Sequence, residues 1–336
     1  MLTSFIKFGD GRLSTETDEK TLAAAARDPK AAFWLDMNKP TDEELALLDD
    51  VFGFHPLAIE DTIQPNPERP KIESYNHVGD AFRQGYFYMV IHGPDLATFR
   101  EHLKTKELDM FVSERYLVTV HDEPHRSVTD MINRARSDPR VVLDPGIDIL
   151  LHNILDLLVD NYRPILDYLQ EEIDELEERA ATDPKPDLLP KIAGKKRDLL
   201  NLRRIIGPQR DVLAQLTRGE VPFIRETTRI YLRDVQDHLN RAVEMIELYR
   251  DLVIGARDIY LSSISNNLNQ IMKTLTIITV VALPMTVITS FFGMNFDGVP
   301  GWDWMLHHPA GFWGAILVIL AIVFGVLWLF RRNKWI

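Results

Sequence analysis

Short apolar runs of strand length, separated by polar turns, characterise roughly the first 140 residues of the chain. Thr41 and Glu44 have the spacing of a capping box, which predicts a helix over Asp42–Phe52 that stops at Gly53. We therefore expect a small α/β domain over residues 1–140. The predicted strands are Ala32–Met37, Gln84–Ile91, Leu108–Val112 and Tyr116–His121, with a short hairpin at Ser113-Glu114-Arg115 between the last two.

Helical spacing of the apolar residues replaces this pattern over residues 141–270, which predicts a helical stalk. Two helices are expected first, over about Ile147–Ala181 and Asp187–Arg218, the second kinked at Pro208. The first is acidic and the second basic midway, so we expect an antiparallel pair with complementary faces. From Phe223 to Phe292 the only proline is Pro284, which predicts one helix of about 70 residues with a heptad-like apolar seam in its first half.

Two long runs without a charged residue follow, at residues 274–296 and 309–330. Each has about 22 residues, enough for a helix that crosses a hydrocarbon core of ~30 Å. We predict transmembrane helices over about 271–292 and 309–330, with an outer loop over 293–308. The fold class is then an α+β membrane protein, in which an N-terminal α/β domain and a long helical stalk precede a transmembrane domain over 271–336.

The net charge also differs between the predicted transmembrane domain and the rest of the chain. The chain has 38 Lys and Arg against 50 Asp and Glu, a net charge of −12, which argues against a nucleic-acid partner. Residues 274–336 carry +1, so the first 273 residues carry −13. Arg331, Arg332 and Lys334 follow the second run, whereas the loop holds only Asp297 and Asp303. Positive residues stay on the cytoplasmic side, so we expect both termini in the cytoplasm and the chain in the inner (plasma) membrane.

The first transmembrane helix carries a polar stripe, since several of its polar residues recur at alternating steps of three and four. Each hydroxyl could instead bond the carbonyl four residues earlier, but this explains a single residue better than a whole stripe. Several copies around an axis would enclose a pathway, so we expect a cyclic homo-oligomer and, with Asp258 at the inner mouth, passage of cations. Apolar members of the stripe would close it by dewetting. The stripe consists of Asn269, Met272, Thr276, Thr279, Leu283, Thr286 and Ser290.

A Gly-Met-Asn triplet, Gly293-Met294-Asn295, closes the first transmembrane helix. Together with other motifs in order along nearly the whole chain, it resembles the CorA magnesium transporter family. The other motifs are His55–Asp61, Arg69–Lys71, Arg233–Val235, Tyr260–Ser263, Asn269–Thr276, Leu283–Thr286 and Lys334–Ile336.

The resemblance implies a homopentameric funnel, embedded in the lipid bilayer, that takes up Mg²⁺, with Co²⁺ and Ni²⁺ as further cargo. Gly293, Met294 and Asn295 would form the selectivity filter, whose neutral oxygens suit an ion that dehydrates reluctantly. Gly293 is also a plausible helix C-cap. The pore would be lined by Asp258, Asn269, Met272, Leu275, Thr276, Thr279, Leu283, Thr286 and Ser290. Regulatory Mg²⁺ would bind at subunit interfaces to Glu60, Asp61, Asp156 and Asp234; without the resemblance, Asp61 and Asp234 are ordinary surface carboxylates.

Three alternatives remain. The loop Gly298-Val299-Pro300 is similar to the ZntB branch of the same superfamily, whose members carry Zn²⁺ and are considered proton-coupled, although the intact triplet favours Mg²⁺. The chain has no cysteine, which excludes thiolate zinc sites. A membrane-anchored scaffold or signalling protein would explain the two helices but not the stripe. An enzyme is disfavoured, because the sequence has no phosphate loop, HExxH or GxSxG motif.

Overall fold

The computed structural model describes residues 1–64, 69–75, 85–100, 103–294, 300–301, 308–333 and 335. By its internal contacts the chain divides into two compact units, Met1–Arg257 and Asp258–Ile336. The helix α9 (Glu226–Phe292) contributes residues to both units. The domain boundaries expected near residues 140 and 270 stay predictions.

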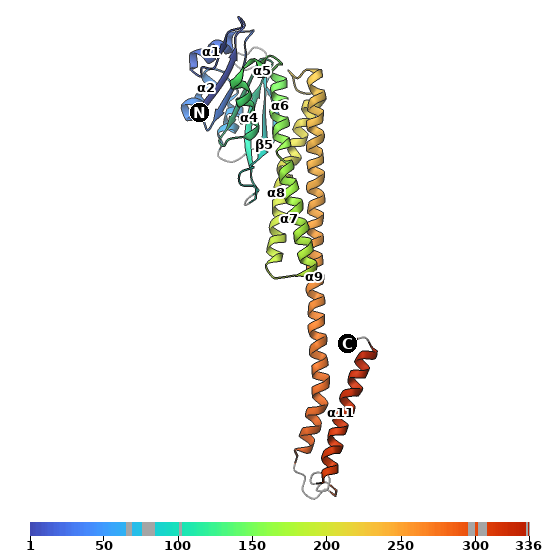
Figure 1. The fold of residues 1–336 in the computed structure, drawn as a ribbon. Coiled ribbons are helices and arrows are strands. Elements are labelled where there is room, and N and C mark those ends of the chain that lie inside the picture. The colour runs from blue at the N-terminus through green and yellow to red at the C-terminus, as the bar shows by residue number, and fades with distance from the viewer. Residues whose placement is uncertain are drawn as a thin grey trace. The chain divides into compact units, whose positions relative to one another are not determined.

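A seven-stranded sheet with the order β2-β1-β3-β7-β6-β5-β4 forms the core of the first unit. The four strands predicted from the sequence are confirmed as β3, β5, β6 and β7, although Gln84 lies outside the described residues. Strands β5 and β7 are buried along almost their whole length, because helices cover both faces of the sheet (Figure 1). The strands are β1 Leu2–Lys7, β2 Leu13–Ser14, β3 Ala32–Asn38, β4 Lys71–Tyr75, β5 Tyr86–Pro94, β6 Thr105–Val112 and β7 Tyr116–His121.

Three short helices, α1 (Glu19–Arg27), α2 (Asp42–Asp50) and α3 (Pro56–Ile63), cover one face of the sheet around a buried aromatic and aliphatic cluster. The capping box of α2 is confirmed, since Thr41 N–H donates to Glu44 Oε2 at 3.0 Å and Glu44 N–H donates to Thr41 Oγ1 at 3.3 Å. The helix ends at Asp50, two residues before the predicted end.

Three further helices cover the other face, namely α4 (Arg126–Ser137), the single-turn α5 (Arg140–Leu143) and α6 (Ile147–Asp160). The single helix predicted over Ile147–Ala181 is wrong, because the chain breaks at Asn161 and Tyr162 before α7 (Arg163–Thr182) begins. Pro164 explains the break, since a proline has no N–H to donate to the carbonyl four residues earlier and its ring clashes with that carbonyl.

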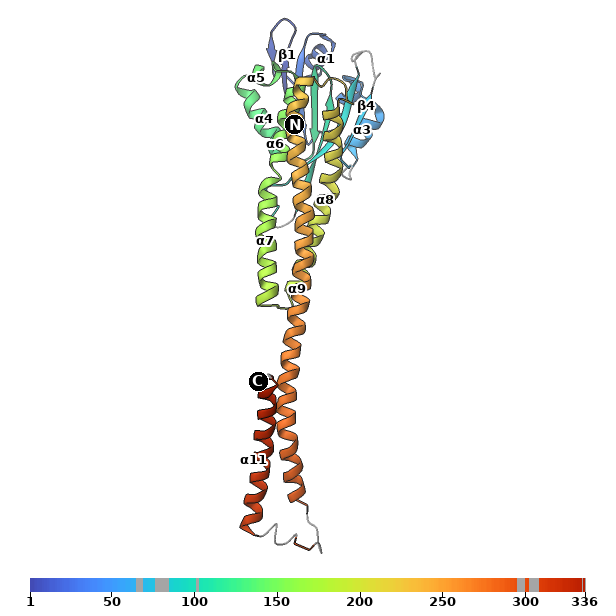
Figure 2. The same cartoon turned by 90° about the vertical axis from the view of Figure 1, so that its right-hand side faces the viewer.

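The helices α7 and α8 (Leu188–Arg218) form the predicted antiparallel pair (Figures 1 and 2). Their facing surfaces carry opposite charges. Lys195 Nζ lies 3.3 Å from Glu172 Oε2 across the pair. Pro208 lies inside α8, and the helix ends at Gly219, whose φ of 76° a residue with a Cβ rarely adopts.

The first part of α9 packs on these helices through the predicted seam. Arg203 of α8 pairs with Glu247 of α9 at 2.7 Å, and Tyr249 Oη donates to Gln170 of α7 at 3.2 Å. At the start of α9, Thr228 Oγ1 donates to the buried Asp148 of α6 at 2.6 Å. The buried seam consists of Leu232, Val235, Leu239, Ala242, Ile246, Tyr249, Val253 and Ala256.

The second unit contains the rest of α9 and α11 (Pro309–Arg332), which lie side by side in both views (Figures 1 and 2). Both helices are long and apolar enough to cross a membrane, as the sequence predicts. Phe291 of α9 and Gly314 of α11 line an apolar space between them. Most of their other large apolar side chains are exposed, which calls for a covering of lipid or protein.

Candidate metal centre and ion pathway

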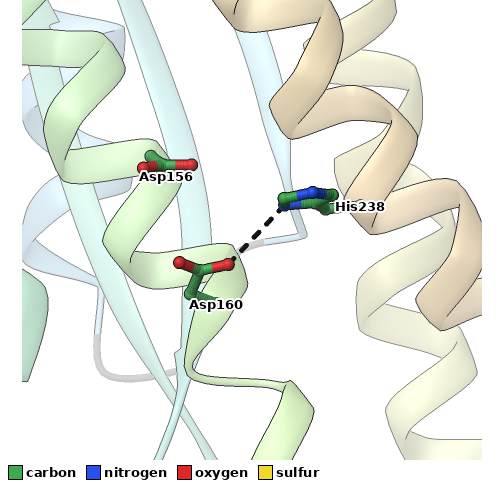
Figure 3. Close-up of side chains that lie close together, drawn as sticks. All are labelled: Asp156, Asp160 and His238. Atoms are coloured by element: carbon green, nitrogen blue, oxygen red, sulfur yellow. Dashed lines mark ion pairs between the residues drawn. The ribbon is translucent and has the colours of Figure 1, made fainter.

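Three metal-ligating side chains converge between α6 and α9: Asp156, Asp160 and His238 (Figure 3). One ligand atom from each lies within 4.8 Å of the others. Asp160 Oδ1 is 3.6 Å from His238 Nδ1, and Asp234 Oδ2 is 3.9 Å from His238 Nε2. Among the described residues this is the only group of three or more such side chains.

The local sequence explains why these groups meet. Asp156 and Asp160 are four residues apart on α6, and Asp234 and His238 are four residues apart on α9, so each pair occupies one face of its helix. The apolar residues beside them are buried in the helix contact, which leaves the polar pairs at its rim. These apolar neighbours include Leu155 and Val159 on α6 and Val235 and Leu239 on α9.

The electrostatics of this cluster favour a cation. Burial raises the pKa of Asp156, and the negative charge of Asp160 raises it further. A bound cation would relieve this repulsion. A groove of about 370 Å³ opens beside Asp160 and His238, so ions reach the cluster from solvent.

The donor set fits a divalent cation that keeps part of its water shell. Carboxylate oxygens suit Mg²⁺, and an imidazole nitrogen adds affinity for Co²⁺, Ni²⁺ or Zn²⁺. Asp156 and Asp234 are predicted from the sequence, whereas Asp160 and His238 are missed. The signal for both was the spacing of four residues from a predicted ligand.

The other two predicted regulatory residues lie elsewhere on the single chain. Glu60 and Asp61 belong to α3, and Glu60 borders a shallow groove with Ile59 and Ile63. Asp61 forms an ion pair with Lys71, whose Nζ is 2.5 Å from Asp61 Oδ2. Within the described part of one chain, the structure therefore brings Asp156 and Asp234 to one cluster and does not bring Glu60 or Asp61 to it.

The nine residues predicted to line a pore all lie on α9, and all nine are exposed in the single chain. The threonine hydroxyls donate to the carbonyl four residues earlier: Thr276 at 2.8 Å, Thr279 at 2.9 Å and Thr286 at 3.0 Å. Each of these three hydroxyls therefore bonds its own helix, which is the alternative considered for single residues in the sequence. It is compatible with a pathway, because a hydroxyl that donates to its own helix keeps its lone pairs for a cation or its waters.

The Gly-Met-Asn triplet begins where α9 ends. Gly293 N–H donates to Thr289 O at 3.0 Å, and Met294 N–H donates to Phe291 O at 3.2 Å. Gly293 therefore closes the last turn of the helix, and Met294 is 49% exposed. Asn295 lies outside the described residues.

Comparison with known proteins settles the family. The sequence profile of CorA-like Mg²⁺ transporter proteins matches residues 29–332. This chain belongs to the CorA family. A relative from Thermotoga maritima, named cobalt/magnesium transport protein CorA, is 30% identical over 311 residues, which cover 92% of this chain and 85% of the relative. YfjQ from Bacillus subtilis (strain 168), named for metal ion transport, is 35% identical over 305 residues, 91% of this chain and 90% of the relative.

Solved structures confirm the predicted fold class of this CorA-family chain. The complete CorA magnesium transporter from Methanocaldococcus jannaschii superposes with a TM-score of 0.79, at 24% identity, over 99% of this chain and 98% of that one. A relative from Pectobacterium atrosepticum named zinc transport protein ZntB is 28% identical over 186 residues, 55% of each chain. The chain is thus a membrane transporter of divalent metal ions and belongs to a family of transporters rather than enzymes.

Proposed function

We propose that this chain assembles into a homopentameric channel for the uptake of Mg²⁺, which also passes Co²⁺ and Ni²⁺. The exposed polar stripe of α9 is the observation that carries the proposal. Hydroxyl and amide oxygens recur on one face of a helix whose other exposed residues are mainly apolar. Such a face is stable in a membrane when it borders water, and copies of α9 around one axis would provide that water-filled path.

The outer mouth would select the ion. Carbonyl oxygens near Gly293 and the amide of Asn295 would contact a hydrated cation without removing its water, which suits Mg²⁺. The number five and the role of Asn295 rest on the resemblance to the CorA family. The flanking charges support a plasma-membrane location with both termini in the cytoplasm.

Cytoplasmic Mg²⁺ would close the channel by binding between subunits. Glu60 and Asp61 lie apart from Asp156 and Asp234 in a single chain, which supports a site completed by the neighbouring subunit. Residues 1–273, the expected cytoplasmic part, have a net charge of −13, so their acidic surfaces repel one another until cations bridge them. High internal Mg²⁺ would then hold a symmetric closed funnel, and low Mg²⁺ would release it.

Proton-coupled zinc transport is the second candidate. The Gly298-Val299-Pro300 loop and the imidazole of His238 favour it, whereas the intact triplet favours Mg²⁺. A membrane-anchored scaffold, the candidate from a different class, would carry no ion.

Uptake by purified protein in liposomes tests all three candidates. A magnesium channel takes up Mg²⁺ without a pH gradient, and Asn295→Ala removes most of this uptake. Zinc uptake that requires inward protons would replace the first candidate by the second. Protein that inserts correctly and carries neither ion would favour the scaffold. Native mass spectrometry of the same preparation measures the number of subunits, for which five is expected.

A further inference from the structure

Asp61, one of the predicted regulatory carboxylates, forms an ion pair within the chain. Lys71, the first residue of β4, places its Nζ 2.5 Å from Asp61 Oδ2 and 3.8 Å from Glu73 Oε1. The side chains of Lys71 and Asp61 are only 25% and 19% exposed. The pair is therefore partly shielded from water and from dissolved salt, unlike most surface ion pairs.

The surrounding residues hold the ammonium in place. Lys71 Nζ lies 5.8 Å from the centre of the Tyr88 ring, within the range of a cation–π contact. Tyr88 is itself fixed, since it is fully buried and its Oη donates to Asp109 Oδ1 at 2.5 Å. Thr62, next to Asp61 in α3, lies 3.4 Å from the same Tyr88 hydroxyl. The packing of α3 and β4 on β5 thus sets Asp61 and Lys71 opposite each other.

The second half of the predicted site has a different character. Among the described residues, no Lys or Arg forms an ion pair with Asp156, Asp160 or Asp234. A cation that reaches these carboxylates therefore has no such ion pair to displace, although Arg163 and Arg241 line the groove beside Asp160. At Asp61, by contrast, it meets one supplied by the chain.

We propose that Lys71 is a resident counter-ion of Asp61, which a divalent cation must displace, so that Lys71 sets the Mg²⁺ affinity of the cytoplasmic site. The inference rests on the proposed function in one respect, since it takes Asp61 as a ligand of the regulatory ion. An ammonium carries one charge and forms hydrogen bonds to the same oxygens that Mg²⁺ needs. Its presence weakens Mg²⁺ binding and keeps the carboxylate neutralised when Mg²⁺ is scarce.

Replacement of the charge tests this assignment. Lys71→Met keeps most of the side-chain length, and Lys71→Gln keeps a hydrogen-bond donor in case the methionine variant fails to fold. Both should lower the Mg²⁺ concentration that gives half of the thermal stabilisation of the purified full-length protein, by about tenfold, which corresponds to 1.4 kcal/mol. Lys71→Arg should stay within about threefold of the unmodified protein.

Two controls separate this role from a merely structural one. Lys7→Met removes an ion pair of similar length, 2.6 Å to Asp144, elsewhere in the first unit, and should leave the Mg²⁺ midpoint unchanged. In an Asp61→Asn background, Lys71→Met should no longer tighten binding, because the two groups act on each other.

The outcomes also separate the inference from the proposed function. Unmodified protein that gains no stability from Mg²⁺ would overturn both. A clear Mg²⁺ response that Lys71→Met and Lys71→Gln leave unchanged or weaken would overturn only the role of Lys71. Tighter binding that persists in the Asp61→Asn background would show that Lys71 does not act through Asp61, which also overturns the inference.

Discussion

Between Glu226 and Arg257, α9 buries a continuous seam of apolar side chains against α6, α7 and α8. Beyond Tyr260 the same helix buries no side chain, and large residues such as Leu283 are 61% exposed. The backbone is helical throughout, so the two parts differ in their side chains and in what surrounds them. The first part is explained within one chain, whereas the second calls for a covering of lipid or protein.

The contrast extends to charge. In the first unit, some charged groups have close partners, as Asp148 has Arg225 and Thr228, whereas Asp156 and Asp234 form no ion pair with a Lys or Arg among the described residues. The apolar runs of the second unit have no charged residue, and their polar groups are hydroxyls and amides. Under the proposed function, the first part of α9 responds to ions by electrostatics, and the second lets them pass with little binding.

The largest expected effect concerns the buried seam. Leu239→Ala removes a side chain that is fully buried in α9, and should lower the free energy of unfolding by about 3 kcal/mol. Leu283→Ala removes the same atoms from the exposed part and should change it by less than about 0.5 kcal/mol. Urea denaturation of the detergent-solubilised protein, followed by circular dichroism, measures both. Equal losses would contradict the division of α9 into two environments.

The next effect tests the ion pair that fixes the start of α9. Burial opposes ionisation of Asp148, but hydrogen bonds from Arg225 and Thr228 outweigh it and lower its pKa below the usual 3.8. The carboxylate therefore stabilises the fold above pH ~4, and this contribution is lost as the pH falls through the lowered pKa. Asp148→Asn should cost about 2 kcal/mol at pH 7, since Arg225 loses its partner.

The pH dependence provides the check on this assignment. Melting temperatures between pH 7 and pH 2.5 should fall less steeply for Asp148→Asn than for the unmodified protein. Asp138→Asn, which removes an exposed partner of Arg140, serves as the matched control and should change little at pH 7. Parallel pH profiles for the Asp148 variant and the unmodified protein would show that Asp148 is not the group that titrates.

A smaller effect is expected at the cluster of Asp156, Asp160 and His238. His238→Ala removes the one nitrogen ligand and should weaken the binding of Co²⁺ by about tenfold, or 1.4 kcal/mol. Mg²⁺ prefers oxygen ligands, so its binding should change by less than about threefold. Isothermal titration of the full-length protein measures both ions. If His238→Ala weakened Mg²⁺ and Co²⁺ alike, the imidazole would act on the fold of the cluster rather than as a ligand.

The sequence predicts those elements whose signal is local. The uncharged runs before Phe292 and after Pro309 identify both membrane helices, and short apolar runs bounded by polar turns identify β3 and β7. The break between α6 and α7 was missed although Pro164 marks it. The apolar residues of α6 and α7 keep one helical spacing across the break. This continuous spacing favoured a single helix over the break that the proline indicates.

Contacts between distant elements were harder to predict. The pairing of Asp61 with Lys71 depends on how α3 and β4 pack on β5. The hydrophobic periodicity of the sequence does not indicate this packing. The cluster of Asp156, Asp160 and His238 depends in the same way on the face that α6 turns to α9. The family resemblance gives one candidate on each helix, Asp156 and Asp234, but only the fold shows that they lie in one cluster with Asp160 and His238.

The smallest effect on stability is expected on the polar stripe, where the effect on transport should be clear. Thr279→Val replaces a hydroxyl that donates to Leu275 O at 2.9 Å with a methyl group of similar size. The free energy of unfolding should change by less than about 0.5 kcal/mol, because the residue is exposed. Thr274→Val is the matched control, since Thr274 makes the same kind of bond, to Gln270 O at 3.0 Å, but lies off the stripe. If the stripe borders the ion path, Thr279→Val lowers Mg²⁺ uptake into liposomes several-fold and Thr274→Val does not. Equal uptake by the two variants would mean that these hydroxyls serve only their own helix.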